Sequence, residues 1–162
     1  MSGCVSAARQ FHQADFVSRT RQVIIDSGIK PDKLKLELTE SLILDDVNET
    51  ITKMKALSEL GIHFSMDDFG TGYSSLSNLK KLPIKELKID QSFVRDIPGD
   101  KDDASIVQTI IAMAHNLGLN VVAEGVETEE QRAFLEQHDC SVCQGFLFSK
   151  PLPLEKFESL FQ

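Results

Sequence analysis

The 162-residue sequence has few cysteines and no long apolar run. Cys4, Cys140 and Cys143 are too few to build the disulfide framework of a small secreted domain. No stretch approaches the roughly 20 apolar residues that a membrane-spanning helix needs. The N-terminus also lacks the basic-then-apolar order of a signal peptide. These absences predict a cytoplasmic protein that does not use a membrane as its partner.

Basic residues are outnumbered as well, with 17 Lys and Arg against 25 Asp and Glu and a formal net charge of −8. This balance argues against a nucleic-acid polymer or an anionic membrane as the binding partner. It leaves room for a small phosphorylated ligand, because bound metal ions can supply positive charge locally.

Cys140 and Cys143 have the spacing of a zinc or redox motif, but no second Cys/His pair accompanies them. They fall at the start of a predicted strand, where positions i and i+3 face opposite sides. We interpret them as a structural pair of small residues.

Short apolar runs alternate with helical patterns along the chain. We expect strands at 34–38, 62–67, 86–90, 120–124 and 142–148, and a weaker one at 4–7. Between them, apolar residues recur at helical spacing from Phe16 to Ile24, from Ile43 to Leu60 and from Ile106 to Leu117. The first two stripes end at Gly28 and Gly61, and the third ends at Gly118. Alternation of this kind predicts an α/β fold with a parallel sheet.

Three further helix signals accompany these stripes. Asp102 or Asp103 can cap the helix that carries Ile106. Thr128 and Gln131 form a capping-box pattern. A last short helix is expected after Pro153, with Phe157, Leu160 and Phe161 on its inner face. No Pro/Gly/Ser-rich linker divides the chain, so residues 1–162 are predicted to form one domain.

The predicted strands repeatedly end on acidic residues. Glu37, Asp67, Asp68, Asp90 and Glu124 all stand at or just beyond a strand end. The carboxyl ends of parallel strands meet at one rim, where catalytic and metal-binding groups collect. So many carboxylates would repel one another unless cations lay among them. The pattern therefore predicts a divalent-metal site.

The stretch that begins Asp67-Asp68-Phe69-Gly70-Thr71-Gly72 is the most specific. Adjacent carboxylates can bind two cations when the chain leaves its pleat at a strand end. One of the two carboxylates then bridges the cations. Two cations about 4 Å apart would clamp the attacking and leaving oxygens of a phosphodiester. Alternatives are a plain polar turn and a kinase-like Asp-Phe-Gly. A kinase would also need a glycine-rich phosphate loop and a His-Arg-Asp catalytic loop, and neither is present.

Five motifs in order resemble the EAL domain, the bacterial cyclic-di-GMP phosphodiesterase family, from about Arg9 to the C-terminus. Residues 1–8 are either uncertain in this resemblance or outside the family. The motifs are Leu36-Glu37-Leu38-Thr39-Glu40-Ser41, Asp67 to Leu76, Leu87-Lys88-Ile89-Asp90, Val122 to Glu127 and Gln144 to Pro151. The resemblance implies a modified TIM (βα) barrel. It also implies Mg²⁺- or Mn²⁺-dependent hydrolysis of cyclic di-GMP to linear pGpG in second-messenger signalling.

The resemblance also implies a role for each matching residue. Glu37 and Asp67 resemble ligands of one metal, and Asp67 would bridge to a second metal held by Asp68 and Glu124. Lys88, Glu124 and Glu127 resemble the catalytic set, with Lys88 at the lysine that contacts the nucleophilic water. Glu40, Asp90 and Gln144 match supporting residues, and Glu40 would anchor the loop that contains Phe69, Gly70, Thr71 and Gly72.

Each role has a structural alternative when its residue is taken alone. Glu37 would be an exposed edge residue, Lys88 a solvated strand end and Gln144 a buried amide. The histidines match no family ligand and are interpreted as structural or surface residues; they are His12, His63, His115 and His138.

Two departures from the family pattern bear on activity. No glutamate precedes Glu37, so the signature Glu-Ala-Leu glutamate is missing, and Val5 stands where the family has a metal-binding asparagine. We expect one metal site to be defective and the chain alone to be weak or inactive. We also expect a barrel that lacks its first strand and helix, covered by a homodimer or a domain-swapped oligomer. The alternatives are a catalytically inactive binding or dimerisation module and a remnant that folds only as an oligomer.

Overall fold

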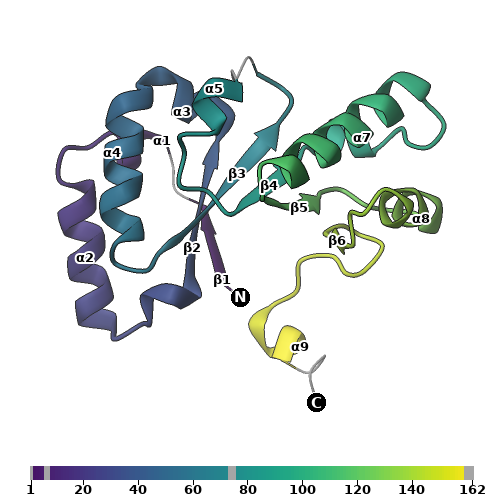
Figure 1. Cartoon of the computed structure of the whole chain (residues 1–162). Helices are drawn as coiled ribbons and strands as arrows, with labels where there is room; N and C mark the ends of the chain where they lie inside the picture. Colours follow the sequence, from purple (N-terminus) through teal and green to yellow (C-terminus); the bar gives the residue numbers. More distant parts are fainter. Residues whose placement is uncertain (1, 6–7, 73–75, 159–162) are drawn as a thin grey trace.

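The computed structural model describes residues 2–5, 8–72 and 76–158. They form a sheet of six parallel strands in the order β1-β2-β3-β4-β5-β6 (Figure 1). The strands are β1 Ser2–Val5, β2 Leu34–Thr39, β3 His63–Phe69, β4 Glu86–Ile89, β5 Asn120–Ala123 and β6 Val142–Cys143. The α/β class and the parallel sheet are confirmed.

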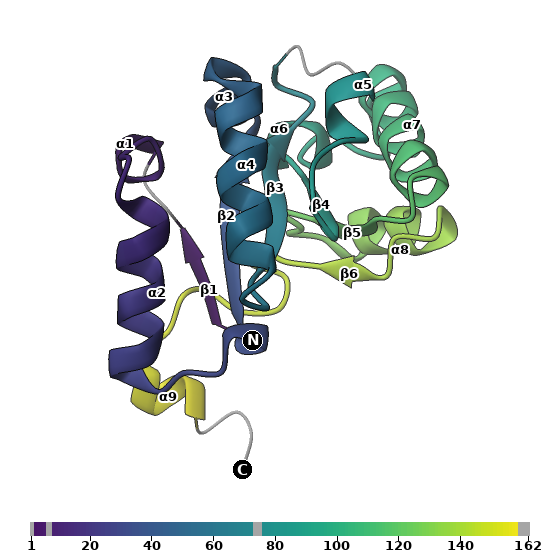
Figure 2. The same ribbon diagram turned by 60° about the vertical axis from the view of Figure 1, so that its left-hand side comes forward.

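Helices connect the strands. The longer ones are α2 Phe16–Ser27, α4 Val47–Ser58, α7 Lys101–Asn116 and α8 Glu129–Gln137. The shorter ones are α1 Ala8–Phe11, α3 Glu40–Asp45, α5 Leu76–Leu79, α6 Gln91–Val94 and α9 Leu154–Glu158, with a 3₁₀ turn at Pro31–Lys33. Helices α4 and α7 lie against the strands they connect, as Figures 1 and 2 show from two sides.

The two faces of the sheet differ in chemistry. Alternate residues such as Leu38, Phe64, Met66 and Leu87 are buried in the apolar core beneath the helices. Their neighbours along each strand point to the opposite face, which is polar and carries charged side chains. Because every strand pairs in parallel with the next one in sequence, all carboxyl ends lie at one rim.

The sheet is an incomplete βα barrel. Its edges are β1 and β6, and no pairing joins these two strands within the described residues. A closed barrel of this type usually needs about 250 residues. Within the same ranges, no helix combines the length and the apolar character needed to cross a membrane.

The helix ends lie close to the positions that the sequence predicts. Gly28, Gly61 and Gly118 all have positive φ, at 68°, 99° and 72°, which a glycine adopts without steric cost. Thr128 and Gln131 form the predicted capping box at the start of α8. These local signals depend on few neighbours, which is why the sequence reveals them.

Two predicted elements are present with different bounds. The strand expected at 142–148 ends at Cys143, because the chain turns at Gly145, where an added Cβ would lie 2.1 Å from the Val126 carbonyl oxygen. The apolar stripe from Ile43 to Leu60 is divided between α3 and α4. Extended backbone at Asp46 separates them, and its side chain caps α4 by accepting from the Glu49 N–H.

Two details of helix ends also differ. The cap of α7 is Asp100, whose carboxylate accepts from the N–H groups of both Asp102 and Asp103. In α9 the Phe157 side chain is 50% exposed, so it does not lie on an inner face. Leu160, Phe161 and the end of the weak strand predicted at 4–7 lie outside the described residues.

Candidate active site

A β-bulge brings two adjacent carboxylates together at the end of β3. The β3–β4 register shifts between Met66 and Phe69, and Asp68 adopts a positive φ of 52°. In a regular pleat, neighbouring side chains point to opposite faces, and the bulge removes that separation. Carboxylate oxygens of Asp67, Asp68 and Glu124 consequently all lie within 4.8 Å of one another.

A buried lysine joins the carboxylates of three strand ends. Lys88 of β4 is 5% exposed. Its Nζ lies 3.1 Å from Glu37 Oε2, 3.1 Å from Asp67 Oδ1 and 2.5 Å from Glu124 Oε1. Burial alone would lower the pKa of Lys88, but the hydrogen bonds to Glu124, Asp67 and Glu37 outweigh it and raise that pKa above its ordinary value. Lys88 is therefore a fixed cation within the rim.

Two acids of this rim, Glu124 and Asp68, have pKa values above those of free carboxylates. Burial raises the pKa of Glu124, and the nearby Asp67 and Glu37 raise it further, although Lys88 opposes the shift. Burial also raises the pKa of Asp68, with Asp67 and Asp90 adding repulsion. One lysine thus compensates the repulsion among these acids incompletely. Crowded oxygen donors of this kind suit a hard divalent cation such as Mg²⁺ or Mn²⁺.

Glu40 holds the loop that follows Asp68. Its side chain is buried, and Oε2 accepts from the N–H groups of Gly70 at 3.3 Å and Gly72 at 3.1 Å. A Cβ at Gly72 would meet the Glu40 carboxylate at 2.8 Å, so the backbone approaches closely here. Thr71 closes the turn by donating from Oγ1 to the Asp68 carbonyl at 2.8 Å.

Asp90 has a local structural task as well. Its Oδ1 accepts from the Ser92 N–H at 2.8 Å and so caps α6. Because its carboxylate also lies close enough to Asp68 to raise the pKa of that residue, Asp90 belongs to the outer part of the rim.

Glu127 and Gln144 are not brought into this cluster. Both residues are exposed. The Glu127 N–H donates to Gln131 Oε1 at 2.7 Å, and the Gln144 backbone links Ala123 to Val126. The structural alternative for Gln144, a buried amide, is wrong. Both residues lie beside the site, and these hydrogen bonds involve their backbone groups.

Cys140 and Cys143 have the properties of structural residues. Cys140 is buried, and burial raises the pKa of its thiol to about 12. Both side chains are free thiols.

One ion pair near the site was missed in the sequence. Lys35 Nζ donates to Glu86 Oε1 at 2.7 Å. The signal that could have found it is the alternation of Lys35 with Glu37 on one strand and of Glu86 with Lys88 on another. Alternating positions in a strand share a face.

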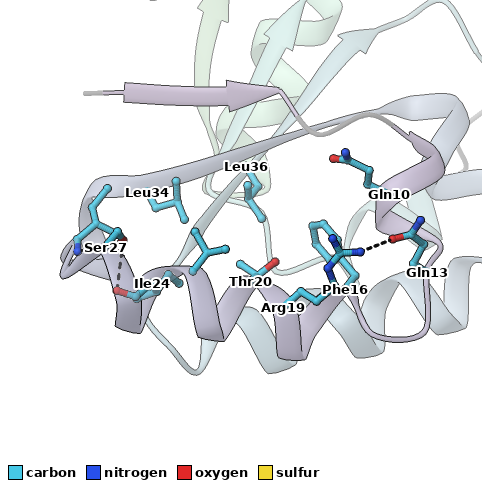
Figure 3. Close-up of a pocket in the computed structure, with 11 residues that line it drawn as sticks. Gln10, Gln13, Phe16, Arg19, Thr20, Ile24, Ser27, Leu34 and Leu36 are labelled. Atoms are coloured by element: carbon cyan, nitrogen blue, oxygen red, sulfur yellow. Dashed lines mark hydrogen bonds between the residues drawn. The ribbon is translucent and has the colours of Figure 1, made fainter.

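The larger of two described cavities lies elsewhere. This groove, about 570 Å³ in volume, runs between α2 and β2, and none of the rim carboxylates lines it. Figure 3 shows Leu34 and Leu36 of β2 facing Thr20 and Ile24 of α2. The chemistry of the rim sets it apart as the candidate site, because the groove lining carries no acid.

An open parallel α/β sheet with an acidic rim around a buried lysine defines an incomplete βα-barrel domain. The profile of the EAL domain matches residues 5–151. The chain therefore belongs to the EAL domain family.

Relatives of known name agree with this assignment. The cyclic di-GMP phosphodiesterase NbdA of Pseudomonas aeruginosa is 46% identical over 155 residues, which are 96% of this chain and 20% of NbdA. The chain thus spans about a fifth of the length of that relative.

Solved structures agree as well. The PaMucR phosphodiesterase in complex with c-di-GMP is 43% identical with a TM-score of 0.92, covering 96% of this chain and 63% of that one. The manganese and cyclic-di-GMP complex of Klebsiella pneumoniae BlrP1 is 33% identical with a TM-score of 0.83, covering 92% and 38%. These comparisons bear out the barrel fold expected from the sequence.

Proposed function

We propose that this chain carries the metal-dependent cyclic-di-GMP phosphodiesterase site of its relatives. The observation that carries the proposal is the clustering of the Asp67, Asp68 and Glu124 carboxylates within 4.8 Å, beside Lys88. The names of NbdA and PaMucR and the ligands of the BlrP1 complex support the substrate and the need for a divalent ion.

The donor set of this chain divides between two proposed ions, Mg²⁺ or Mn²⁺. Glu37 and Asp67 would hold one, and Asp67, Asp68 and Glu124 would hold the other. Bound ions of this kind lower the pKa of a water molecule and neutralise charge on phosphodiester oxygens. In the reaction, water adds to phosphorus and one P–O bond of the ring breaks, which gives linear pGpG.

The other residues orient this set. Lys88 holds Glu37, Asp67 and Glu124 at fixed separations through its three close contacts. Glu40 fixes the loop after Asp68 through two backbone N–H groups. Positioning of several ligands by hydrogen bonds is needed for efficient catalysis, because small misplacements of reacting groups are costly. We assign Asp90, Glu127 and Gln144 to support of the rim.

We propose further that the 162-residue chain by itself hydrolyses cyclic di-GMP weakly or not at all. Val5 pairs in register with Glu37 at the carboxyl end of β1, beside the rim. Valine has no side-chain oxygen or nitrogen that can bind a metal ion, so position 5 supplies no ligand to the ion proposed for Glu37 and Asp67. The second candidate function, an inactive binding module, is favoured by this same observation.

Hydrolysis of cyclic di-GMP by the purified chain, with Mn²⁺ or Mg²⁺ added, separates these two candidates. Asp67→Asn is the control, because it removes the carboxylate shared by both proposed ions while retaining size. Slow hydrolysis that is lost in the control supports the phosphodiesterase. A folded chain that binds cyclic di-GMP in titration calorimetry without hydrolysis supports the binding module, and a chain that neither binds nor hydrolyses contradicts both.

We also propose that the chain self-associates as a homodimer or domain-swapped oligomer. The support is the pairing of β1 on one side only among the described residues and the groove beside it, where the Val23 side chain is 64% exposed. An open edge and exposed apolar side chains favour association.

A further inference from the structure

A second ion pair lies next to the acidic rim, two residues earlier along the strands. The Lys35–Glu86 bond of 2.7 Å joins side chains that are 22% and 17% exposed. Lys35 belongs to β2 and Glu86 to β4, so the bond crosses the intervening strand β3. This position is two residues below Glu37 on β2 and two residues below Lys88 on β4.

The Lys88–Glu37 contact of 3.1 Å crosses β3 in the same way. Both Glu37 and Glu86 lie in register with Ser65 of β3. A small side chain at Ser65 allows the long side chains of β2 and β4 to meet above it. We call Lys35, Glu37, Glu86 and Lys88 the charge quartet.

Charges alternate around the quartet. Along β2 the cation Lys35 precedes the anion Glu37, and along β4 the anion Glu86 precedes the cation Lys88. Each member therefore has a cross-strand partner of opposite charge and a same-strand neighbour of opposite charge. A largely buried charge that loses its partner is unfavourable, so it is drawn to the nearest opposite charge that remains.

We propose that the Lys35–Glu86 pair is a positioning pair for the active site. Its task is to keep Glu86 from attracting Lys88, and to keep Lys35 from attracting Glu37. Lys88 then remains with the rim carboxylates, and Glu37 remains available as a ligand. This inference rests on the proposed function, because it concerns the same rim.

Each single neutralising substitution should leave one charge of the Lys35–Glu86 pair without its partner. That charge can then compete with the rim for Lys88 or Glu37. Lys35→Met leaves the Glu86 carboxylate unpaired, and this carboxylate draws Lys88 away from Asp67 and Glu124. Glu86→Gln leaves the Lys35 ammonium unpaired, and it sequesters Glu37. Loss of a partner that orients metal ligands typically lowers metal affinity by about 10- to 100-fold, so we expect each single variant to bind Mn²⁺ about tenfold more weakly.

Two double variants distinguish positioning from simple stabilisation. The neutral double variant, Lys35→Met with Glu86→Gln, removes both competitors and should restore Mn²⁺ affinity to nearly that of the wild type. The charge-swapped variant, Lys35→Glu with Glu86→Lys, retains an ion pair between these positions. It places a carboxylate beside Glu37 and an ammonium beside Lys88, so it should bind Mn²⁺ as weakly as the single variants.

The experiment is calorimetric titration of Mn²⁺ into the full 162-residue chain and its variants, with circular dichroism to check folding. The matched control is Lys53→Met, which removes a buried lysine that belongs to a different ion pair. Its Nζ lies 2.7 Å from Glu49 Oε1 and donates to the Phe11 carbonyl at 2.9 Å. This control should lower the melting temperature and leave Mn²⁺ affinity unchanged.

Weak binding by the single variants, together with restoration in the neutral double variant alone, supports the proposal. Wild-type affinity in both single variants overturns it, as does equal restoration by the charge-swapped variant. If the single variants do not fold, the comparison between the two double variants decides. A wild-type chain that binds no Mn²⁺ overturns the proposed function and this inference together, whereas unaffected variants of a binding wild type overturn this inference alone.

Discussion

Ser65 carries a buried hydroxyl that has no hydrogen-bond partner among the described residues. Its side chain is fully buried, between Glu37 and Glu86 in register. Leaving a buried polar group unsatisfied costs about 1–3 kcal/mol. The size of this residue, which lets the charge quartet form above it, is therefore more important than its hydroxyl.

Ser65→Ala should consequently raise the free energy of unfolding by about 1 kcal/mol, since it removes the unsatisfied group and keeps the small size. Urea denaturation with an unchanged m-value would measure the gain. Thr128→Ala is the contrasting control, because the Thr128 hydroxyl accepts from the Gln131 N–H at 3.2 Å and its loss should cost about 1 kcal/mol. A loss of stability in Ser65→Ala as large as in this control would show that the Ser65 hydroxyl is satisfied by ordered water.

The candidate site was predictable from the sequence where its residues follow strand ends. Asp67, Asp68 and Glu124 meet because parallel strands bring their carboxyl ends to one rim. The contact of Lys88 with three carboxylates at once was not predictable, because it depends on the β3 bulge at Asp68 and on the spacing of β2, β4 and β5. Distances across several strands are tertiary properties that a single sequence does not contain.

Helix α7 shows how capping signals compete within a few residues. Asp100, Asp102 and Asp103 all stand near its start, and each is a good cap residue by type. Asp100 is the cap because its backbone is extended, with φ −89° and ψ 123°, and its Oδ1 receives two N–H groups. Asp102 and Asp103 lie in the first turn, where their charge favours the helix dipole.

Asp100→Ala should therefore lower the free energy of unfolding by about 1 kcal/mol, because two N–H groups lose their acceptor. Asp102→Ala is the matched control and should cost less, about 0.3–1 kcal/mol, through the helix dipole alone. Chemical denaturation of the two variants under identical conditions gives the comparison. A larger loss in the Asp102 variant would assign the cap to one of the two residues that the sequence suggested, Asp102 or Asp103.

Element boundaries were predictable where glycine or capping chemistry acts locally, as at Gly28 and Thr128. The end of β6 was not predictable from the sequence. It depends on the contact of Gly145 with the Val126 backbone, and these two residues are too far apart in the sequence to form a local pattern. The break between α3 and α4 at Asp46 was not predictable either, because the apolar stripe continues across it without interruption. Apolar periodicity reports which face is buried and does not report where the backbone turns.

At the scale of the whole molecule, the β1 edge of the sheet is the one that lies beside an apolar groove. Within the described part of the chain, β1 pairs with β2 alone, and the groove between α2 and β2 opens beside it. Helix α2 contains no buried residue, and its Val23 and Ile25 side chains are 64% and 65% exposed. Helix α7, by contrast, has five buried residues facing the sheet. Burial of the exposed apolar side chains on this flank would therefore favour association.

Val23→Lys should accordingly shift the chain from dimer to monomer, because an ammonium in the groove cannot be buried against apolar side chains without a large desolvation cost. Sedimentation velocity at tens of micromolar would show the change. Ile106→Lys is the matched control: Ile106 is 39% exposed on α7, which packs on β4 and β5, whereas α2 lies at the β1 end of the sheet at the left of Figure 1. The control should remain dimeric. A wild-type chain that sediments as a monomer at these concentrations would contradict self-association, and a Val23→Lys variant that remains dimeric would move the interface away from the groove.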